Sequence, residues 1–505
     1  MTGLRDRLRR LLPARALGRP AVVLACLAAL FAVVSAQRAA LYVRDPDVWW
    51  LAAVGRDFIL RGVWPRTNFY SFAVPAYPWR THEWAFSALY AAGLTRIGPG
   101  FFPLIGLVCA TLTALAVARL GLTRARHPAA GAMMALLSVG ATAPALFEPR
   151  PAYASLIFPA VVTSLAFGPR FGWRQAAAAT VTVWLWTQCH GSFPLGVLLL
   201  LASAWSETSS PPARKFRLGA AAAALLATLL NPYGIGLYRL VASYAAGTDP
   251  AARVILSSIK EFAPVWRAQP PYRNAFDFAM LSLTALLAMA SLAQASTRRR
   301  GVVVLGLVAA AVLQVRHLTL AVLLGPVLLT GVVDRWLESD TRTRDARRLS
   351  LAGTLAALAP GLLVGAVLWA RAWAARSADD WIGTELGGRD AAALIRALPA
   401  NARVWAPFQT SGLVLWYGAT QGVRVLHDPR NDCYPADIAV ADWRLGSSET
   451  SAKAALSLLD TTGTNTVLAP SWHPRIRQLE RSGCWETAAR EGRWQVERRV
   501  AGPCR

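Results

Sequence analysis

Residues 104–118 read LIGLVCATLTALAVA, a stretch without a single charged side chain. Comparable apolar blocks recur along the chain, among them Ala21–Val34 and Leu195–Ala202. Blocks of about 17–25 residues match the hydrocarbon thickness of a bilayer when they are helical, and Gly, Ser, Thr and Trp at the edges lengthen the shorter ones. The blocks predict an α-helical polytopic membrane protein with about eleven transmembrane helices.

The composition supports a membrane protein and argues against a nucleic-acid partner. Of the 505 residues, 55% are hydrophobic and only 16% are charged, which is too little charge for the surface of a soluble protein of this size. The formal net charge of +25 comes almost entirely from arginine, since Lys215, Lys260 and Lys453 are the only lysines. Many arginines stand in short clusters between apolar blocks, which is the pattern that orients membrane helices. We therefore expect membrane lipid, and no nucleic acid, as a partner.

Arginine placement predicts which connections lie in the cytoplasm. Met1–Pro20 is strongly basic, and with this segment inside, the arginine-rich connections between spans all fall on the cytoplasmic side. No clean cleavage site follows, so we expect the first helix to be retained rather than removed as a signal peptide. The predicted spans are residues 20–42, 101–119, 129–147, 151–168, 175–190, 193–206, 218–231, 276–295, 301–315, 318–335 and 350–370. The N-terminus is then cytoplasmic and the tail extracytoplasmic.

The predicted membrane domain, residues 1–370, carries two large outer loops. The first, residues 43–100, is too long for a plain turn. Its residues Asp47–Gly62 have an apolar face, and residues 83–98 form a second apolar segment that is short for a span. Both segments contain tryptophan, so we predict two helices that lie along the outer membrane surface. The second large outer loop covers residues 232–275.

Residues 371–505 change character, because apolar runs shorten while charges and turn residues appear. Short strands are expected at Arg403–Ala406, Arg424–His427 and Thr464–Leu468, helices at Ala391–Leu398, Ala436–Leu445, Ala452–Leu459 and Pro474–Arg481, and a closing hairpin at Trp485–Ala488 and Trp494–Val500. This pattern predicts a small extracytoplasmic α/β domain. The segment contains no glycine-rich phosphate loop and no nucleophile elbow.

The six cysteines stand singly, without the spacing of a metal site. Three of them, Cys433, Cys484 and Cys504, lie in the tail. One disulfide there would suit an extracytoplasmic domain, and unpaired thiols suit the spacing equally well.

Two aspartates follow the first predicted helix, because Asp45 and Asp47 flank Pro46. Carboxylates this close can share a divalent metal ion, Mg²⁺ or Mn²⁺, or one of them can act as a general base. A purely structural interpretation also fits, since Asp45 suits the N-cap of a helix and Pro46 its first residue. Asp45 and Asp47 are therefore candidates for catalysis or metal binding, with a helix cap as the alternative.

Other candidates fall at the outer ends of the predicted helices, where ionisable residues often serve function. His82 and Glu83 place an imidazole beside a carboxylate, which suits phosphate binding or support of a base, although a surface pair is the commoner explanation. Arg150 presents a planar fork that matches phosphate oxygens. The alternative for Arg150 is a simple turn in which it pairs with Glu148.

Two more histidines stand at outer helix ends, His190 and the His317 of the pair Arg316–His317. A single histidine at such a place is usually a satisfied structural residue. Three from different segments at one depth, counting His82, indicate a shared site or a coincidence of topology. In the tail, His427–Asp432 is a polar cluster that is compatible with an active-site loop or with a β-turn stabilised by Asp and Pro.

Taken together, these residues resemble a known family. The pattern Asp45-Pro46-Asp47-x-Trp49-Trp50, followed by Trp79-x-x-His82-Glu83-Trp84, resembles the first outer loop of bacterial polytopic membrane proteins related to the GT-C glycosyltransferase superfamily. Further matching positions are Arg150-Pro151, Trp186, His190-Gly191-Ser192-Phe193, Asn231-Pro232-Tyr233-Gly234, Glu261-Phe262, Arg316-His317, Asp428, Arg430 and Tyr434. The resemblance spans most of the chain, in order.

The resemblance implies a fold, an activity and a location. GT-C enzymes hold a polyprenyl-phosphate-linked sugar near the outer membrane surface, and an acidic residue of the first outer loop acts as base or metal ligand. The implied acceptor is a glycan or lipid of the cell envelope, and the implied location is the bacterial cytoplasmic (inner) membrane, with a periplasmic or extracellular C-terminal domain. The implied site residues are Asp45, Asp47, His82 and Glu83 for catalysis, and Arg150, His190, Arg316 and His317 for the donor phosphate.

Two alternatives belong to other classes of protein. A transporter or lipid flippase would have charged residues near the membrane midplane, often on broken helices, whereas the polar residues here crowd the outer end. A non-catalytic envelope scaffold, whose tail binds a partner, would use the aspartate pair only as a helix cap.

Overall fold

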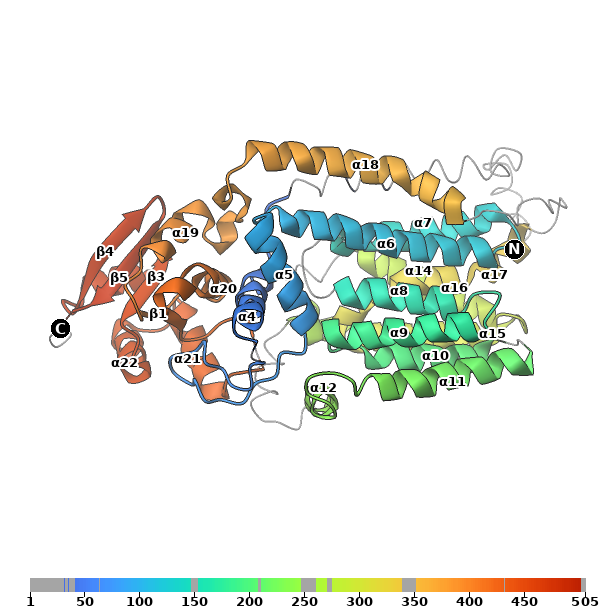
Figure 1. The fold of residues 1–505 in the computed structure, drawn as a ribbon, viewed down its shortest axis with the longest axis horizontal. Coiled ribbons are helices and arrows are strands. Elements are labelled where there is room, and N and C mark those ends of the chain that lie inside the picture. Colours follow the sequence, from blue (N-terminus) through green and yellow to red (C-terminus); the bar gives the residue numbers. More distant parts are fainter. Residues whose placement is uncertain are drawn as a thin grey trace.

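A computed structural model describes the fold of the chain. The described residues are Phe31, Ser35, 41–62, 64–146, 153–207, 210–246, 260–269, 275–337, 351–430 and 432–500. A bundle of long helices forms one half of the molecule and an α/β region the other, and helices α4 and α5 lie where the halves meet (Figure 1).

The bundle consists of helices that follow the apolar blocks of the sequence. Each span predicted from residue 101 onward has a helical counterpart. The helices are α6 (Phe101–Arg124), α7 (Pro128–Leu146), α8 (Ala154–Ala166), α9 (Trp173–Cys189), α10 (Pro194–Ser206), α11 (Pro211–Ala227), α14 (Ala275–Leu292), α15 (Arg298–Leu313), α16 (Leu318–Leu328), α17 (Thr330–Leu337) and α18 (Leu351–Ala375). Buried Ala, Leu and Val side chains of α6, α7, α8, α10 and α16 form their common core.

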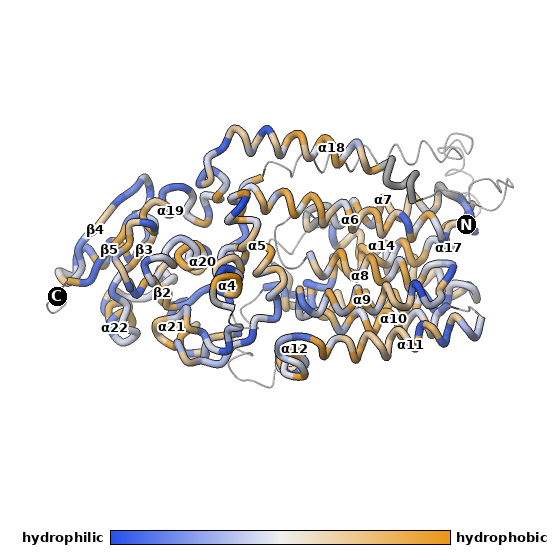
Figure 2. Tube along the Cα trace, in the orientation of Figure 1, coloured by the Kyte–Doolittle hydropathy of each residue, from blue (hydrophilic) through white to orange (hydrophobic). Residues whose placement is uncertain are grey.

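The bundle helices are mostly hydrophobic along their length (Figure 2). Among the described residues, three helical stretches combine the length and hydropathy needed to cross a bilayer: α6, α14 and residues Leu358–Ala375 of α18. Several others, such as α8 and α10, are equally apolar but shorter. This composition agrees with a multi-pass membrane protein. The number of eleven spans stays a prediction, and the predicted first span lies outside the described residues except for Phe31, Ser35, Leu41 and Tyr42.

Both helices predicted for the first outer loop are present. Helix α4 covers Asp47–Arg61 and ends at Gly62, whose φ of 62° lies in the left-handed region that glycine adopts without strain. Helix α5 covers Trp84–Arg96 and packs tightly on α4. A side chain on Gly55 of α4 would lie 1.8 Å from the carbonyl oxygen of Ser87, so only glycine allows this approach. Their position on the membrane surface stays a prediction.

Short helices lie in the segments between the long helices of the bundle. They are α12 (Gly236–Ala246), η2 (Lys260–Phe262), η3 (Val265–Arg267) and η4 (Val315–His317). Of these, α12, η2 and η3 belong to the predicted second outer loop, while η4 connects α15 to α16.

The C-terminal α/β region, from η6 to β5, contains a mixed five-stranded sheet of order β2-β1-β3-β5-β4. The first three strands in this order are parallel, and β5 is antiparallel to both β3 and β4. The elements are η6 (Asp379–Trp381), η7 (Thr384–Leu386), α19 (Gly388–Arg396), β1 (Arg403–Trp405), α20 (Phe408–Tyr417), η8 (Ala419–Gln421), β2 (Arg424–Val425), α21 (Ala436–Gly446), α22 (Ala452–Thr462), β3 (Thr466–Pro470), α23 (Pro474–Glu480), β4 (Trp485–Glu491) and β5 (Trp494–Arg499). The strands and hairpin predicted for the tail are confirmed, and helix α20 is an addition.

The first outer loop shares one hydrophobic core with the C-terminal α/β region. Trp49 and Leu51 of α4 are fully buried in the same cluster as Leu413 and Val414 of α20. A side chain on Gly412 would lie 2.7 Å from the carbonyl oxygen of Pro46, so α20 approaches the start of α4 closely. The predicted division of the chain at residues 370 and 371 stays a prediction, but the packing joins residues 43–100 to both sides of it.

Candidate functional site

A glutamine at the end of helix α9 ties the first outer loop to the bundle. Trp84 Nε1 donates to Gln188 Oε1 at 2.9 Å, and Gln188 Nε2 donates to the carbonyl oxygen of Leu230 at 3.1 Å. Beside this contact, a side chain on Gly191 would lie 3.4 Å from Cδ2 of His82. The hydrogen bond from Trp84 to Gln188 and the close approach of Gly191 to His82 therefore place the segment around His82 against the residues at the end of α9.

The turn Asn231–Gly234 supports the same loop from another direction. Asn231 Oδ1 accepts from the backbone N–H of Tyr233 at 2.8 Å, which shapes the turn. The hydroxyl of Tyr233 accepts from the backbone N–H of Thr81 at 3.3 Å and donates to the carbonyl oxygen of Pro65 at 3.2 Å. The residue just before His82 is thereby held by the second outer loop.

The His82 cluster, defined as His82, Glu83, His190 and Arg316, collects four of the predicted site residues. Glu83 Oε1 lies 3.5 Å from His82 Nε2 and 3.6 Å from His190 Nε2. The charge of Arg316 acts on all three of these groups, lowering the pKa values of His82, Glu83 and His190. The Arg316 guanidinium also lies 4.3 Å from the centre of the Phe262 ring and 3.9 Å from a Glu261 oxygen.

Hydrogen bonds to Nδ1 of His190, the ring nitrogen that faces away from Glu83, determine which nitrogen carries the proton. The backbone N–H of Ser192 donates to His190 Nδ1 at 3.2 Å, and the Ser192 hydroxyl lies 2.7 Å from the same nitrogen. Ser155 Oγ lies 3.1 Å away and completes the group. Because Nδ1 accepts a backbone N–H, we assign the proton of the neutral ring to Nε2, which faces Glu83.

Opposite pKa shifts separate the two histidines. Burial lowers the pKa of His82, but the Glu83 and Asp432 carboxylates outweigh it and raise the pKa to about 9. Burial lowers the pKa of His190 to about 4, and Glu83 only partly opposes this. Burial raises the pKa of Glu83, but His82 and His190 bring it below its ordinary value. At neutral pH, His82 is therefore a cation, His190 is neutral and Glu83 is an anion.

Asp432 is a member of the site that the sequence analysis did not assign. Its Oδ2 lies 3.8 Å from His82 Nδ1, and its Oδ1 accepts from Trp79 Nε1 at 3.1 Å. It comes from the polar cluster His427–Asp432 of the C-terminal α/β region. The only signal in the sequence was the density of charged residues there, because nothing local indicated that the segment reaches the first outer loop.

Asp45 and Asp47 lie at the start of α4, as predicted. Asp45 Oδ1 accepts from the backbone N–H of Asp47 at 2.8 Å. The helix begins at Asp47, so Pro46 takes the N-cap position that the sequence predicts for Asp45, and Asp45 stands one residue before it. Trp50 Nε1 donates to Asp47 Oδ1 at 3.1 Å. Burial raises the pKa of Tyr90 well above its usual value, and the charges of Asp45, Glu83 and Asp47 add to this shift. The charges of these three carboxylates therefore act on the same buried tyrosine.

The structure says less about the remaining predicted site residues. Arg150 lies outside the described residues. His317 follows Arg316 in η4 and is half-buried. Within the described part of the chain, no group of three or more His, Cys, Asp or Glu side chains is arranged to hold a metal ion. Binding of Mg²⁺ or Mn²⁺ by Asp45 and Asp47 stays a prediction.

Replacing Gln188 by leucine is expected to lower the free energy of unfolding by about 1–3 kcal/mol, because the Trp84 indole N–H loses its partner and the Leu230 carbonyl keeps only that of Trp184 Nε1. Thermal unfolding in detergent measures the effect. Trp84→Phe provides the matched variant, because it removes the indole N–H itself, so that no buried donor stays without a partner. In the double variant the two effects should not add, and simple additivity would show that the contact is not formed.

Comparison with known proteins places the fold. No protein-family model and no curated protein sequence matches the chain. Among solved structures, the archaeal oligosaccharyltransferase AglB from Archaeoglobus fulgidus, in complex with an inhibitory peptide and a dolichol-phosphate, matches with a TM-score of 0.50 at 11% identity, over 92% of this chain and 72% of AglB. Two further matches have TM-scores of 0.49. They are the apo crystal structure of the Archaeoglobus fulgidus oligosaccharyltransferase, at 13% identity over 89% of this chain and 69% of that one, and the arabinofuranosyltransferase AftD from Mycobacteria, at 15% identity over 95% of this chain and 40% of AftD.

Proposed function

We propose that this chain, which has the fold of the GT-C glycosyltransferases, transfers a sugar from a polyprenyl-phosphate donor to an envelope or lipid acceptor at the outer face of the membrane. One observation carries the proposal. Beside an apolar helix bundle, the His82 cation lies 3.5 Å from Glu83, and the charge of Arg316 acts on both groups. Asp45 and Asp47 stand at the start of α4, which packs on the helix α5 that follows Glu83. Such a site offers positive charge for a phosphate and carboxylates for a proton.

The cations have a defined task in this reaction. When the anomeric carbon leaves the donor, the bond to the lipid phosphate breaks and negative charge grows on the phosphate oxygens. Fixed cations on those oxygens lower the barrier. We assign this task to His82 and Arg316, with Arg150 and His317 as further contacts. His190 is neutral at physiological pH, so its task is instead to position Glu83 through its Nε2–H.

The carboxylates take the proton of the acceptor. The acceptor oxygen forms a new bond to the anomeric carbon, and its proton passes to Asp47 or Asp45. The leaving phosphate is already charged, so the reaction needs no second carboxylic acid, unlike glycoside hydrolysis. Both aspartates are held by hydrogen bonds at the start of α4, which orients their carboxylates.

The expected location is the bacterial cytoplasmic membrane, with the N-terminus in the cytoplasm and the C-terminal α/β region in the periplasm or outside the cell. Cys484 in that region is disulfide-bonded, and disulfides persist in oxidising compartments rather than in the cytosol. Cys433 is a free thiol buried in the region's core. The disulfide therefore supports an extracytoplasmic placement of the region, and with it of the His82 cluster.

A non-catalytic scaffold is the second candidate function. The observation that favours it is the hydrogen bond from the Asp47 backbone N–H to Asp45, since a cap explains one aspartate without chemistry. It does not explain why a charged His82 lies against a nearly buried Glu83.

Replacing Arg316 by glutamine is expected to weaken binding of a polyprenyl phosphate to the purified protein about ten- to hundred-fold, because one hydrogen bond to a charged group is worth roughly 1.5–3 kcal/mol. The measurement is titration of the detergent-solubilised protein with the lipid phosphate. Arg477→Gln makes the same change on an exposed arginine of α23 and should bind like the parent. Equal binding by the Arg316 variant would remove that residue from the phosphate site.

A further inference from the structure

We infer that Asp432 of the C-terminal α/β region is a positioning residue of the site, which together with Glu83 orients the His82 ring and keeps it positively charged. The inference rests on the proposed function only in one respect, namely that the charged His82 then binds the donor phosphate. It makes the C-terminal α/β region part of the site rather than an appended module.

The geometry gives each ring nitrogen of His82 its own carboxylate. Nε2 faces Glu83 at 3.5 Å and Nδ1 faces Asp432 at 3.8 Å. A neutral imidazole has a proton on only one nitrogen, so two carboxylates on opposite sides favour the doubly protonated ring. The side chains of Glu83 and Asp432 are only 10% and 8% exposed, whereas His82 keeps 26% of its surface accessible. A ligand can therefore reach the cation, while its two partners are covered.

Asp432 is itself held in place from the first outer loop. Trp79 Nε1 donates to its Oδ1 and leaves Oδ2 directed at His82. On either side of Asp432, Asn68 of the first outer loop bonds to the chain, once to backbone and once to a side chain. Asn68 Nδ2 donates to the carbonyl oxygen of Cys433 at 2.9 Å, and Asn68 Oδ1 accepts from Arg430 Nη2 at 2.8 Å. Asp432 therefore has little freedom to move away from His82.

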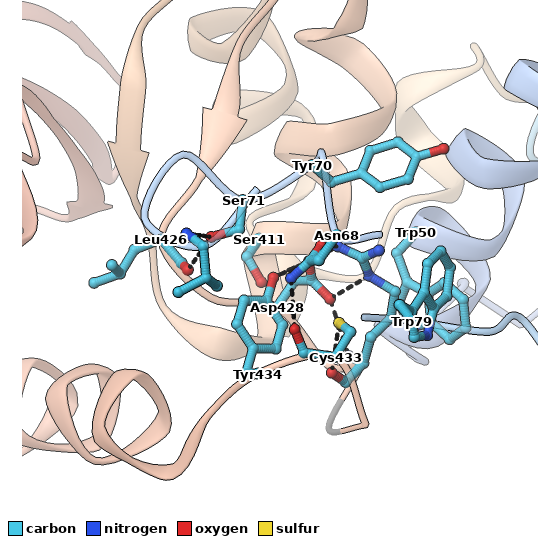
Figure 3. Close-up of polar contacts among 12 residues, drawn as sticks. Trp50, Asn68, Tyr70, Ser71, Trp79, Ser411, Leu426, Asp428, Cys433 and Tyr434 are labelled. Carbon is cyan, nitrogen blue, oxygen red and sulfur yellow. Dashed lines mark hydrogen bonds and ion pairs between the residues drawn. The ribbon is translucent and has the colours of Figure 1, made fainter. Parts of the chain in front are cut away.

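A buried network fixes the segment on the side of the C-terminal α/β region. Asp428 accepts from Arg430 Nε at 2.8 Å and from the Tyr434 hydroxyl at 2.6 Å. Figure 3 shows Asp428, Tyr434, Asn68 and Cys433 converging beside the Trp79 indole. These contacts anchor both ends of the short segment that carries Asp432.

The charged groups around His82 determine its pH dependence. Glu83 and Asp432 favour the cation, Arg316 opposes it, and the ring of His190 lies 6.4 Å away, centre to centre, and is neutral above about pH 4. Because the pKa of His82 is raised to about 9, the cation is present at neutral pH and is lost as the pH rises through 9. Burial raises the pKa of Asp432 itself, while His82, Trp79 and Arg430 oppose this.

Replacing Asp432 by asparagine tests the inference, because the amide oxygen still accepts from Trp79 while the charge is lost. We expect the His82 titration midpoint, followed by NMR of histidine-labelled protein and assigned with His82→Gln, to fall by about one pH unit, the lower end of the effect of a nearby opposite charge. Binding of farnesyl phosphate in detergent should lose strength at a correspondingly lower pH. Asp437→Asn, on an exposed aspartate at the start of α21, is the matched control and should change neither midpoint.

Two further measurements make the result decisive. In a His82→Gln background, Asp432→Asn should no longer affect farnesyl phosphate binding, since Asp432 acts through His82. Thermal unfolding of each variant identifies any general loss of structure. An unchanged His82 midpoint in a folded Asp432→Asn protein overturns the inference. If the midpoint falls but the parent binds no farnesyl phosphate, the positioning role stands and the proposed function fails.

Discussion

Replacing Arg430 by methionine is expected to lower the free energy of unfolding by about 3–5 kcal/mol, because removing one partner of a buried ion pair leaves the other charge uncompensated. The side chains of Arg430 and Asp428 are both fully buried. Arg430 also lies over the rings of Trp79 and Tyr70, with its guanidinium carbon 4.6 and 4.7 Å from their centres. The substitution therefore removes one of the contacts that link the C-terminal α/β region to the first outer loop.

Chemical or thermal unfolding of the purified protein in detergent measures this loss. The double variant Arg430→Met with Asp428→Asn should recover part of it, because no charge then stays buried without a partner. Arg498→Met is the matched control, since Arg498 pairs with Glu486 at the surface, where such pairs contribute about 0–1 kcal/mol. If the Arg430 and Arg498 variants lost equal stability, the buried pair would not join the two regions.

Asp45→Asn and Asp47→Asn are the two variants that test the proposed base. The one that removes the base is expected to slow sugar transfer roughly 10²–10⁴-fold, the usual contribution of general base catalysis. Asparagine keeps an acceptor oxygen for the Asp47 backbone N–H in one case and for Trp50 Nε1 in the other. Asparagine is also a good helix cap. Each variant should therefore fold normally, so that a loss of rate reports on proton transfer.

The assay needs the natural donor. Mass spectrometry of lipid-linked sugars in a strain that lacks the gene identifies it as the lipid that accumulates, and transfer from this donor is then compared between variants. Glu449→Gln, an exposed carboxylate of the C-terminal α/β region, is the control and should retain the parent rate. Parental transfer by both aspartate variants would exclude both residues as the base, whereas the absence of transfer by the parent protein itself would favour the scaffold. Loss in one variant alone assigns the base to that residue.

The elements of this protein were largely predictable from local sequence. Apolar blocks set the bundle helices because a buried or lipid-exposed helix needs an uninterrupted apolar surface, and this requirement is met within one segment. The short strands of the C-terminal α/β region followed from turn residues and apolar alternation. Helix α20 was missed, because it ends in the apolar run Leu413–Tyr417, and helices and strands share such runs.

The candidate site was predictable only as separate residues. His82, Glu83, His190 and Arg316 could each be singled out by residue type and position. That Glu83 lies between the two histidines is a tertiary contact of segments far apart in the chain. Their charges were not predictable, since a histidine beside a carboxylate and a histidine beside two serines look alike in a sequence. Asp432 could not be found at all, because its partner lies several hundred residues earlier.

The sequence by itself determined that the chain forms apolar helices, that a small α/β region follows them, and which side chains could carry chemistry. Only the tertiary structure decided that the first outer loop is enclosed between bundle and α/β region, and that His82 is charged while His190 is neutral. The physical reason is the distance along the chain over which each interaction acts. Hydrophobicity and turn preference act over neighbouring residues, whereas burial and ion pairing depend on which distant segments come into contact.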